Sequence, residues 1–341
     1  MRVMKHVAVA AAAYVGLSSI SDHADVRAKK LSGERVNGGI SRMVLNAHDK
    51  TELNLRLYQY QSCPFSCKVR AFLDYYGFSY EVVEVNPITK SQLGFSKDYR
   101  KVPIITSGEL VLKDSSLIIS KLATFLRRSD LSLHDVENLY PVLEFERNKK
   151  MVVDCPLKYY VMNRSVSEQR TEEVREERVW RQWVDNHFIH LISPNVYRTP
   201  KEALETFKWF SEFGKWEENF TAWNVTLAKY LGAFIMYIVA KRLKAKHKIT
   251  DERKALFDAF TEWMDAIGPE RRFLGGEEPN LADLAMYGAM VAFSGCSAFK
   301  EVAASAPIMR WYTAMHLAVG AHQGRYVIED KSKLAVDTPP Q

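Results

Sequence analysis

The chain has 341 residues, of which 47% are hydrophobic and 26% are charged, so it can build two folded domains and is not a disordered protein. Four cysteines are too few for a disulfide framework, which favours a reducing compartment. The net charge of +6 is mild, lysines and arginines alternate with acidic residues, and no nucleic-acid-binding motif or metal-ligand spacing occurs. These features argue against a nucleic-acid partner and a metal site.

Residues 1–51 are predicted to be an apolar anchor followed by a flexible tether. Basic residues precede an apolar run at 7–20, and no acidic residue occurs before Asp22. The run is shorter than the roughly 17 to 25 residues that cross a bilayer comfortably. An anchor, a secretory signal and a mitochondrial presequence all fit this pattern, and the scarcity of cysteines argues against secretion. We expect a membrane anchor, with a mitochondrial presequence as the alternative.

A strand, a turn and a helix are predicted over residues 55–77. Residues 55–60 alternate apolar and polar side chains, Cys63 falls at the turn, and Pro64 occupies the first helical position. Gly77 ends the helical periodicity.

Cys63 is the candidate nucleophile. A sulfur at a helix start faces unpaired backbone N–H groups and the positive end of the helix dipole, and Lys68 and Arg70 follow within two turns. These features predict a lowered thiol pKa. The alternative is a cysteine packed as a small hydrophobic residue.

The following residues complete a thioredoxin-type order of elements. We expect a strand at 80–85, a polar, weakly periodic segment at 89–99 that forms a helix with a loop, strands at 101–105 and 110–112, and a helix from Asp114 to 126. The resulting β-α-β-α-β-β-α order predicts a thioredoxin- or glutaredoxin-like domain over residues 52–128.

Two points of this domain predict ligand contacts. A cis peptide bond before Pro103 would leave the backbone of Val102 free to pair with an extended, peptide-like ligand. Asp114 and Ser115 open a helix whose N-terminus suits a carboxylate. The alternative is that both residues only cap their helix.

The second half of the chain is predicted to be helical, so the fold class is α/β plus all-α. A charged linker spans 129–178, a helical domain 179–325 and a tail 326–341. Residues 225–243 predict a long helix whose run at 231–240 is apolar on nearly every side, which places it at the centre of a bundle. Asn280 and Asp283 predict a capping box before another buried helix.

The chain resembles the glutathione transferase superfamily and, within it, the microsomal (membrane-associated) prostaglandin E synthase type 2 family. The resemblance spans about residues 53–320, and its most specific strings are Leu57-Tyr-Gln-Tyr60, Cys63-Pro-Phe65, Tyr99-Arg-Lys-Val-Pro103, Asp114-Ser-Ser116 and His190-Leu-Ile-Ser-Pro-Asn-Val-Tyr-Arg-Thr-Pro200. It implies a homodimer that isomerises prostaglandin H2, a lipid endoperoxide, to prostaglandin E2. It also implies a glutathione partner and a Golgi or other endomembrane location, with the catalytic part in the cytosol.

The resemblance also assigns roles to the residues around Cys63. Cys63 would attack the weak O–O bond as a thiolate, and Tyr60 and Phe65 would line the pocket. The glutathione contacts would come from Val102, Pro103, Asp114 and Ser115.

One departure from the family pattern lies beside the nucleophile. The family has Cys-Pro-Phe-Cys, whereas this chain has Ser66 at the fourth position and its next cysteine at Cys67. Ser66 cannot resolve a mixed disulfide and Cys67 is poorly placed for a relaxed bridge. Single-thiol chemistry at Cys63 is therefore favoured over dithiol cycling.

A haem site is the second ligand that the resemblance implies. The candidate residues are His187, His190, Arg242, Lys246 and Lys248, with the basic groups near the propionates. The alternative is a structural histidine pair beside a solvated basic helix end. Two functions therefore compete with the isomerase, namely a monothiol glutathione-dependent thiol transferase and a non-catalytic glutathione or haem carrier.

Overall fold

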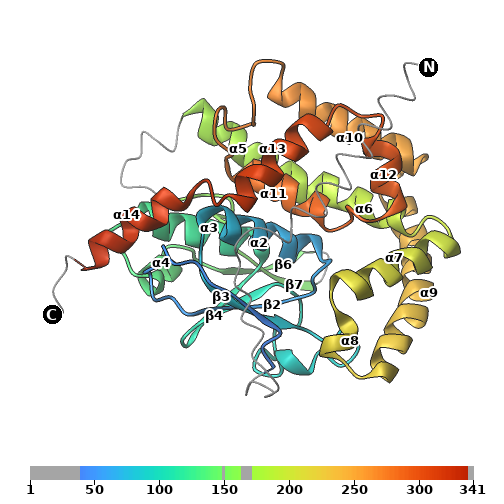
Figure 1. Ribbon diagram of the computed structural model, residues 1–341, viewed down its shortest axis with the longest axis horizontal. Coiled ribbons are helices and arrows are strands. Elements are labelled where there is room, and N and C mark those ends of the chain that lie inside the picture. The colour runs from blue at the N-terminus through green and yellow to red at the C-terminus, as the bar shows by residue number, and fades with distance from the viewer. Residues whose placement is uncertain (1–38, 148–149, 163–170, 337–341) are drawn as a thin grey trace.

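The computed structural model describes residues 39–147, 150–162 and 171–336. The predicted membrane anchor at 7–20 lies outside these residues. The described chain forms a sheet-containing half and a helical half, with the helices α7, α8 and α9 at one side of the molecule (Figure 1).

A mixed five-stranded sheet is the centre of the first half. Its order is β1-β3-β2-β4-β5, with β2 parallel to β3 and the other pairs antiparallel. The strands are β1 (Arg42–Val44), β2 (Leu55–Gln59), β3 (Tyr80–Glu84), β4 (Ile104–Ser107) and β5 (Leu110–Lys113). The alternation predicted for residues 55–60 is present, because Leu55 and Leu57 point into the core and are almost fully buried.

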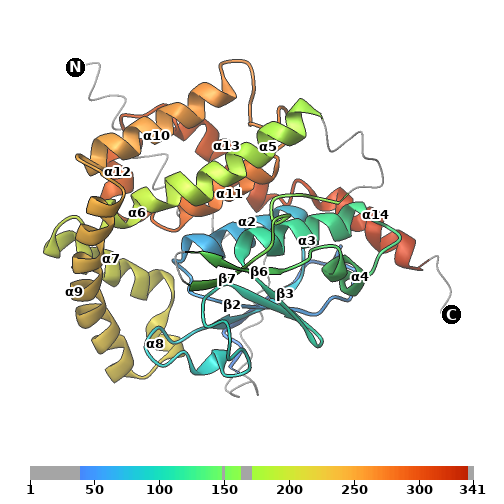
Figure 2. The same ribbon diagram turned by 180° about the vertical axis from the view of Figure 1, so that it is seen from behind.

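Two helices cover one face of this sheet and separate it from the helical half (Figures 1 and 2). They are α2 (Pro64–Tyr76), which Gly77 ends in the left-handed conformation, and α3 (Ser115–Arg127). This arrangement confirms the thioredoxin-like first domain.

The predicted helix at 89–99 is wrong. The segment contains only the 3-10 helix η1 (Ser91–Leu93). The side chain of Asn86 accepts hydrogen bonds from the N–H groups of Ile88 and Thr89, at 2.9 and 3.0 Å. This local turn competes with a helix that has little apolar periodicity to stabilise it.

The predicted tether, linker and tail all contain regular structure. Strand β1 pairs with β3 inside the expected tether. The expected linker holds α4 (Leu133–Asn138) and the hairpin of β6 (Leu143–Arg147) and β7 (Lys150–Asp154). The tail forms α14 (Arg325–Val336), where Lys331 donates to two backbone carbonyl groups after α3. Charge density indicated a solvated face for the linker, but β1, α4 and α14 all pack on the first domain.

The helical half confirms the all-α prediction. Helix α5 (Glu172–Trp183) runs through the π-helix η3 (Val184–Phe188) directly into α6 (Ile189–Val196). The remaining helices are α7 (Pro200–Phe213), α8 (Trp216–Asn219), α9 (Ala222–Lys246), α10 (Glu252–Ile267), α11 (Leu281–Val291), α12 (Ser297–Ala303) and α13 (Met309–Gly320).

Helix α11 fixes the position of α2 and therefore of Cys63. The predicted capping box of Asn280 and Asp283 is present, and the buried Asp283 carboxylate also accepts from the Trp311 indole at 2.8 Å. Gly288 lets the two helices touch, because an added Cβ would lie 2.5 Å from the Cα of Lys68.

The prediction that residues 225–243 lie at the centre of a bundle is wrong. Helix α9 is long and apolar enough to cross a membrane by length and composition, yet only 17% of its apolar window is buried. Small residues such as Ala228 and Ala233 face α6 and α7, whereas Trp223 and Phe234 are exposed. Helix α9 therefore has two apolar faces: one packs on neighbouring helices, and the other is exposed.

Candidate active site

Cys63 lies where the two halves meet. It is the N-cap of α2, with Pro64 as the first helical residue, and its N–H donates to the Tyr60 carbonyl at 3.0 Å. The thiol lines a cavity of about 700 Å³ whose other walls come mainly from α6, α7 and α9. The helix-start position of Cys63 agrees with the sequence analysis.

The prediction of a lowered thiol pKa for Cys63 is wrong for the unliganded protein. Burial in the cavity wall raises the pKa of the Cys63 thiol, and it outweighs the opposing effects of the N–H groups of Ser66 and Phe65, the Ser66 hydroxyl and the Arg70 charge. A ligand that brings hydrogen-bond donors or positive charge to the sulfur would shift it toward the thiolate.

The two nearby cations are engaged elsewhere. Arg70 donates to Gln59, to the Gln61 carbonyl at 2.7 Å and to the sulfur of Cys67 at 3.0 Å. Cys67 is itself buried and donates to the Gln61 carbonyl at 3.2 Å, and burial raises its thiol pKa to about 11. Both sulfurs are free thiols, and Cys67 does not line the cavity.

Lys68 belongs to a buried polar cluster that joins the two halves. Its ammonium group pairs with Asp185 from η3 and donates to the Ser116 hydroxyl at 3.0 Å, and Tyr159 donates to Asp185 at 3.0 Å. Burial alone would raise the pKa of Asp185, but the Lys68 charge and the hydrogen bonds from Lys68, Ser116 and Tyr159 hold it below its usual value. This cluster therefore connects α2, one turn beyond Cys63, and α3 of the first half to η3 of the helical half.

Tyr60 and Phe65 flank Cys63 in the cavity wall. Burial, reinforced by the nearby Cys63 charge, raises the pKa of the Tyr60 hydroxyl to about 12. Tyr60 is therefore a protonated phenol at neutral pH and can act as a hydrogen-bond donor.

The candidate glutathione contacts lie on the sheet side of Cys63 and do not line the cavity. The Val102–Pro103 peptide bond is cis, as predicted, and Val102 belongs to a small apolar cluster against which Cys63 packs. Asp114 has a left-handed φ of 67°, and its carboxylate accepts from the N–H groups of Ser116 and Leu117. Asp114 therefore caps α3, beside the buried Ser115.

Only one of the candidate haem residues reaches the cavity. His190 lines it and stacks on His247 with ring centroids 4.4 Å apart, whereas His187 packs against the Trp183 ring. The basic candidates stand exposed at the end of α9, around His247. They are Arg242, Lys246 and Lys248.

Sequence reasoning missed the greater part of the cavity wall. Apolar side chains of the helical half supply it, and they come from segments that no motif connects to Cys63. Among them are Tyr197, Phe207, Trp216, Leu231 and Ile235. An apolar cavity beside a thiol and a phenol suits an apolar ligand that carries one reactive polar group.

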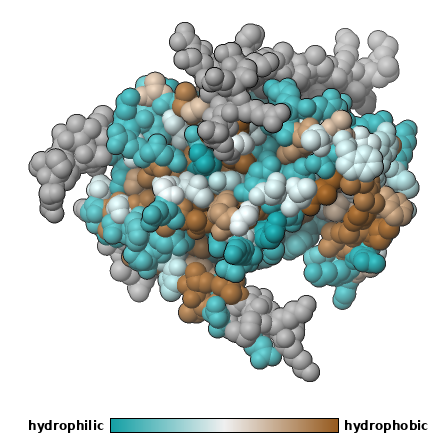
Figure 3. Space-filling view, turned by 90° about the horizontal axis from the view of Figure 1, so that it is seen from below, coloured by the Kyte–Doolittle hydropathy of each residue, from teal (hydrophilic) through white to brown (hydrophobic). Residues whose placement is uncertain are grey.

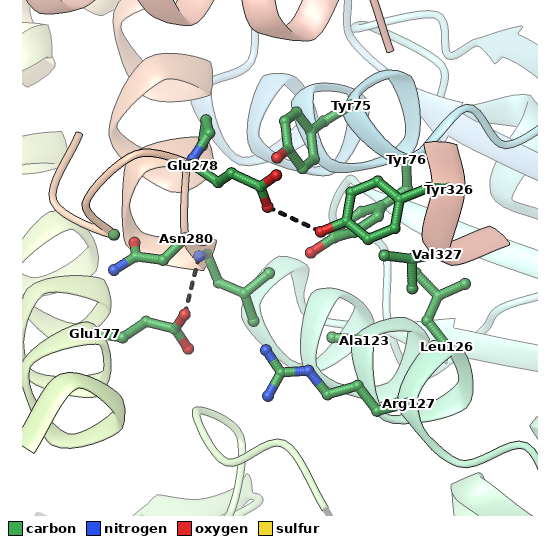
Figure 4. A pocket seen from close by; sticks show the side chains of 13 residues that line it. Tyr75, Tyr76, Ala123, Leu126, Arg127, Glu177, Glu278, Asn280, Tyr326 and Val327 are labelled. Atoms are coloured by element: carbon green, nitrogen blue, oxygen red, sulfur yellow. Dashed lines mark hydrogen bonds between the residues drawn. The ribbon is translucent and has the colours of Figure 1, made fainter. Parts of the chain in front are cut away.

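A second cavity lies at the C-terminal ends of α2 and α3, and so at the other end of α2 from Cys63. Figure 4 shows the side chains that line it. It measures about 350 Å³ and is lined by Tyr75, Tyr76 and Arg127 together with charged groups of the helical half. Tyr326 donates to Glu278 at 2.8 Å across its rim, and the N–H of Leu281 donates to Glu177. These bonds connect α14 to the segment before α11, and α11 to α5. The polar groups around this cavity therefore have a structural role, and no ligand is needed to explain them.

The thioredoxin-like sheet, the cis-proline and the helical half define a protein of the glutathione transferase superfamily. The family model for the glutathione S-transferase N-terminal domain matches residues 57–124. Prostaglandin E synthase 2 from Danio rerio is 42% identical over 79% of this chain and 72% of its own length. The same protein from Mus musculus is 44% identical over 78% and 71%. The chain therefore belongs to the prostaglandin E synthase 2 family. Among solved structures, apo glutathione S-transferase III aligns at 15% identity over 84% of this chain and 99% of its own, with a TM-score of 0.44.

Proposed function

We propose that this chain isomerises prostaglandin H2 to prostaglandin E2, with Cys63 as the nucleophile and glutathione as the associated thiol. The observation that carries the proposal is a helix-start thiol in the wall of an apolar cavity, in a chain more than 40% identical to prostaglandin E synthase 2. A lipid endoperoxide is an apolar molecule with one weak O–O bond, so this cavity matches it in chemistry.

The reaction balances without any added oxidant or reductant. The Cys63 thiolate attacks one peroxide oxygen, so an S–O bond forms, the O–O bond breaks and the other oxygen takes up a proton. Loss of the proton on the adjacent ring carbon then forms the ketone, and the same electron pair expels the thiolate. The neutral Tyr60 phenol donates a hydrogen bond to the oxygen that is released.

Purified protein tests this function when it is given prostaglandin H2 with and without glutathione. Prostaglandin E2 formed faster than in the protein-free reaction supports the proposal. Turnover of glutathione mixed disulfides without action on the endoperoxide would select the monothiol transferase. The buried position of Cys67 is compatible with that function, which uses a single thiol. Inactivity in both assays would select the carrier.

We propose haem as a second occupant of the cavity, where His190 would hold the iron. Two observations support the fit: His190 lines an apolar cavity, and the buried Nε2 of the adjacent His247 has no hydrogen-bond partner within the described chain. Haem supplies one-electron chemistry that would divert an endoperoxide to breakdown. A titration with haem is expected to give a Soret band that His190→Ala weakens or shifts. An unchanged band in that variant would rule His190 out.

We propose that the chain is a homodimer and that the exposed face of α9 is its interface. This face carries Trp223, Tyr230 and Phe234 at 73%, 61% and 61% exposure, and apolar side chains gather at this side of the molecule (Figure 3).

Phe234→Glu is expected to convert the dimer to a monomer, because it buries an unpaired charge in an apolar interface. Sedimentation velocity at several concentrations measures this, with Lys201→Glu on α7 as the control for an added acidic group. A parent chain that sediments as a monomer at all concentrations would refute the interface.

We propose membrane association through residues 7–20, at the Golgi or another endomembrane with the catalytic part in the cytosol. The basic flank and the apolar run support it. Fractionation of cells that express the chain with and without residues 1–20 tests this assignment. Mitochondrial recovery would select the presequence alternative.

A further inference from the structure

Ser66 carries a buried hydroxyl that has no hydrogen-bond partner within the described residues. The side chain is fully buried, in the first turn of α2. Leaving a buried hydroxyl unpaired costs stability, so such a group calls for an explanation. The two basic residues that follow Ser66 in α2, Lys68 and Arg70, are already engaged by other groups.

The position of Ser66 in the helix points it at the nucleophile. Cys63 is the N-cap and Ser66 is the third helical residue, so the two side chains lie side by side at the start of α2, at the two positions that a capping box joins. The Cys63 thiol accepts no capping hydrogen bond. The Cys63 sulfur and the Ser66 hydroxyl therefore take part in no capping hydrogen bond while the sulfur is protonated.

Ionisation of Cys63 would give both the sulfur and the Ser66 hydroxyl a partner. A thiolate is an acceptor only, and it would face the N–H groups of Phe65 and Ser66 together with the Ser66 hydroxyl. Contact with this hydroxyl lowers the pKa of the Cys63 thiol, against the burial that raises it. In the charged state the hydroxyl gains the partner that it lacks in the neutral state.

We propose that the Ser66 hydroxyl donates a hydrogen bond to the Cys63 thiolate and so acts as a positioning residue for the nucleophile. The inference deepens the proposed function, because this site would be used twice: once when the sulfur attacks and again when it departs as the ketone forms. It also gives a reason for serine at the position where the family has its second cysteine. A serine supports the charged sulfur without offering it a disulfide partner.

The test is the pH profile of Cys63 alkylation by iodoacetamide, with the modified peptide quantified by mass spectrometry. Ser66→Ala is expected to raise the apparent pKa of Cys63 by about one unit, since a hydrogen bond to a charged group is lost. The thiolate fraction at neutral pH would then fall about tenfold. Ser66→Thr keeps the hydroxyl and is expected to keep the profile of the parent chain, and Ser305→Ala, on an exposed turn, controls for loss of a hydroxyl elsewhere.

A Ser66→Ala profile that superimposes on that of the parent chain would overturn the proposal. If the alanine variant does not fold, the threonine variant decides, because a raised pKa in that variant contradicts the assigned role. Alkylation needs no endoperoxide, so this result is independent of the isomerase assay. A shifted profile in a protein that makes no prostaglandin E2 would refute the proposed function and leave the Ser66 hydrogen bond standing.

Discussion

Cys63→Ser is expected to abolish isomerisation of prostaglandin H2, whereas Cys67→Ser keeps most of it. A serine hydroxyl is far harder to ionise than a thiol and is a poorer nucleophile toward a peroxide oxygen, so the change removes the reacting group. Cys67 is spatially close but buried, with its sulfur held by the Gln61 carbonyl and by Arg70. We expect a loss of at least about 100-fold in kcat/KM for the first variant, the scale of a missing catalytic group, and less than about threefold for the second.

The measurement is initial prostaglandin E2 formation at saturating glutathione, with unfolding midpoints checked for both variants. Because burial raises the pKa of the Cys63 thiol, activity of the parent chain is expected to rise with pH through the neutral and mildly alkaline range. Equal losses in the two variants would count against the single-thiol mechanism. A pH-independent parent rate would show that ionisation of Cys63 does not limit the reaction.

The nucleophile and the first domain were predictable because the patterns that indicate them involve residues close together in the sequence. Cys63 before Pro64 and the alternation of residues 55–60 are read from neighbouring positions, and so is the capping box at Asn280. Such patterns follow from backbone geometry, which is set within a few residues.

The electrostatics and the cavity wall were not predictable because they depend on tertiary partners. The thiol pKa of Cys63 was wrongly predicted because burial of the sulfur outweighs the groups that lie close in sequence, and Lys68 pairs with Asp185, 117 residues away. Helix α9 shows the same limit, since composition cannot tell a helix buried on all sides from one with an exposed apolar face.

Asp185→Ala is expected to destabilise the protein by about 3 to 5 kcal/mol, since it leaves a buried lysine without its counter-charge. The Lys68 side chain is 1% exposed and that of Asp185 13% exposed, so water cannot replace the missing carboxylate. Urea unfolding followed by tryptophan fluorescence measures the loss, because several tryptophans lie in the helical half. Glu81→Ala, which breaks the half-exposed pair with Arg56, is the matched control and is expected to cost about 1 kcal/mol or less.

The direction of the Asp185 pKa shift determines how this cluster makes protein stability depend on pH. The folded-state pKa of Asp185 lies below its unfolded value, so the pair stabilises the protein fully above the unfolded pKa and the stabilisation is lost as the pH falls through the folded one. Stability of the parent chain is therefore expected to fall below about pH 4, and the Asp185→Ala variant should lack this contribution. Lys68→Met combined with Asp185→Leu should recover most of the loss, because apolar side chains of similar volume replace the pair without leaving a charge behind. If the double variant is as unstable as the single one, the shape of these side chains rather than their charge holds the helical half over Cys63.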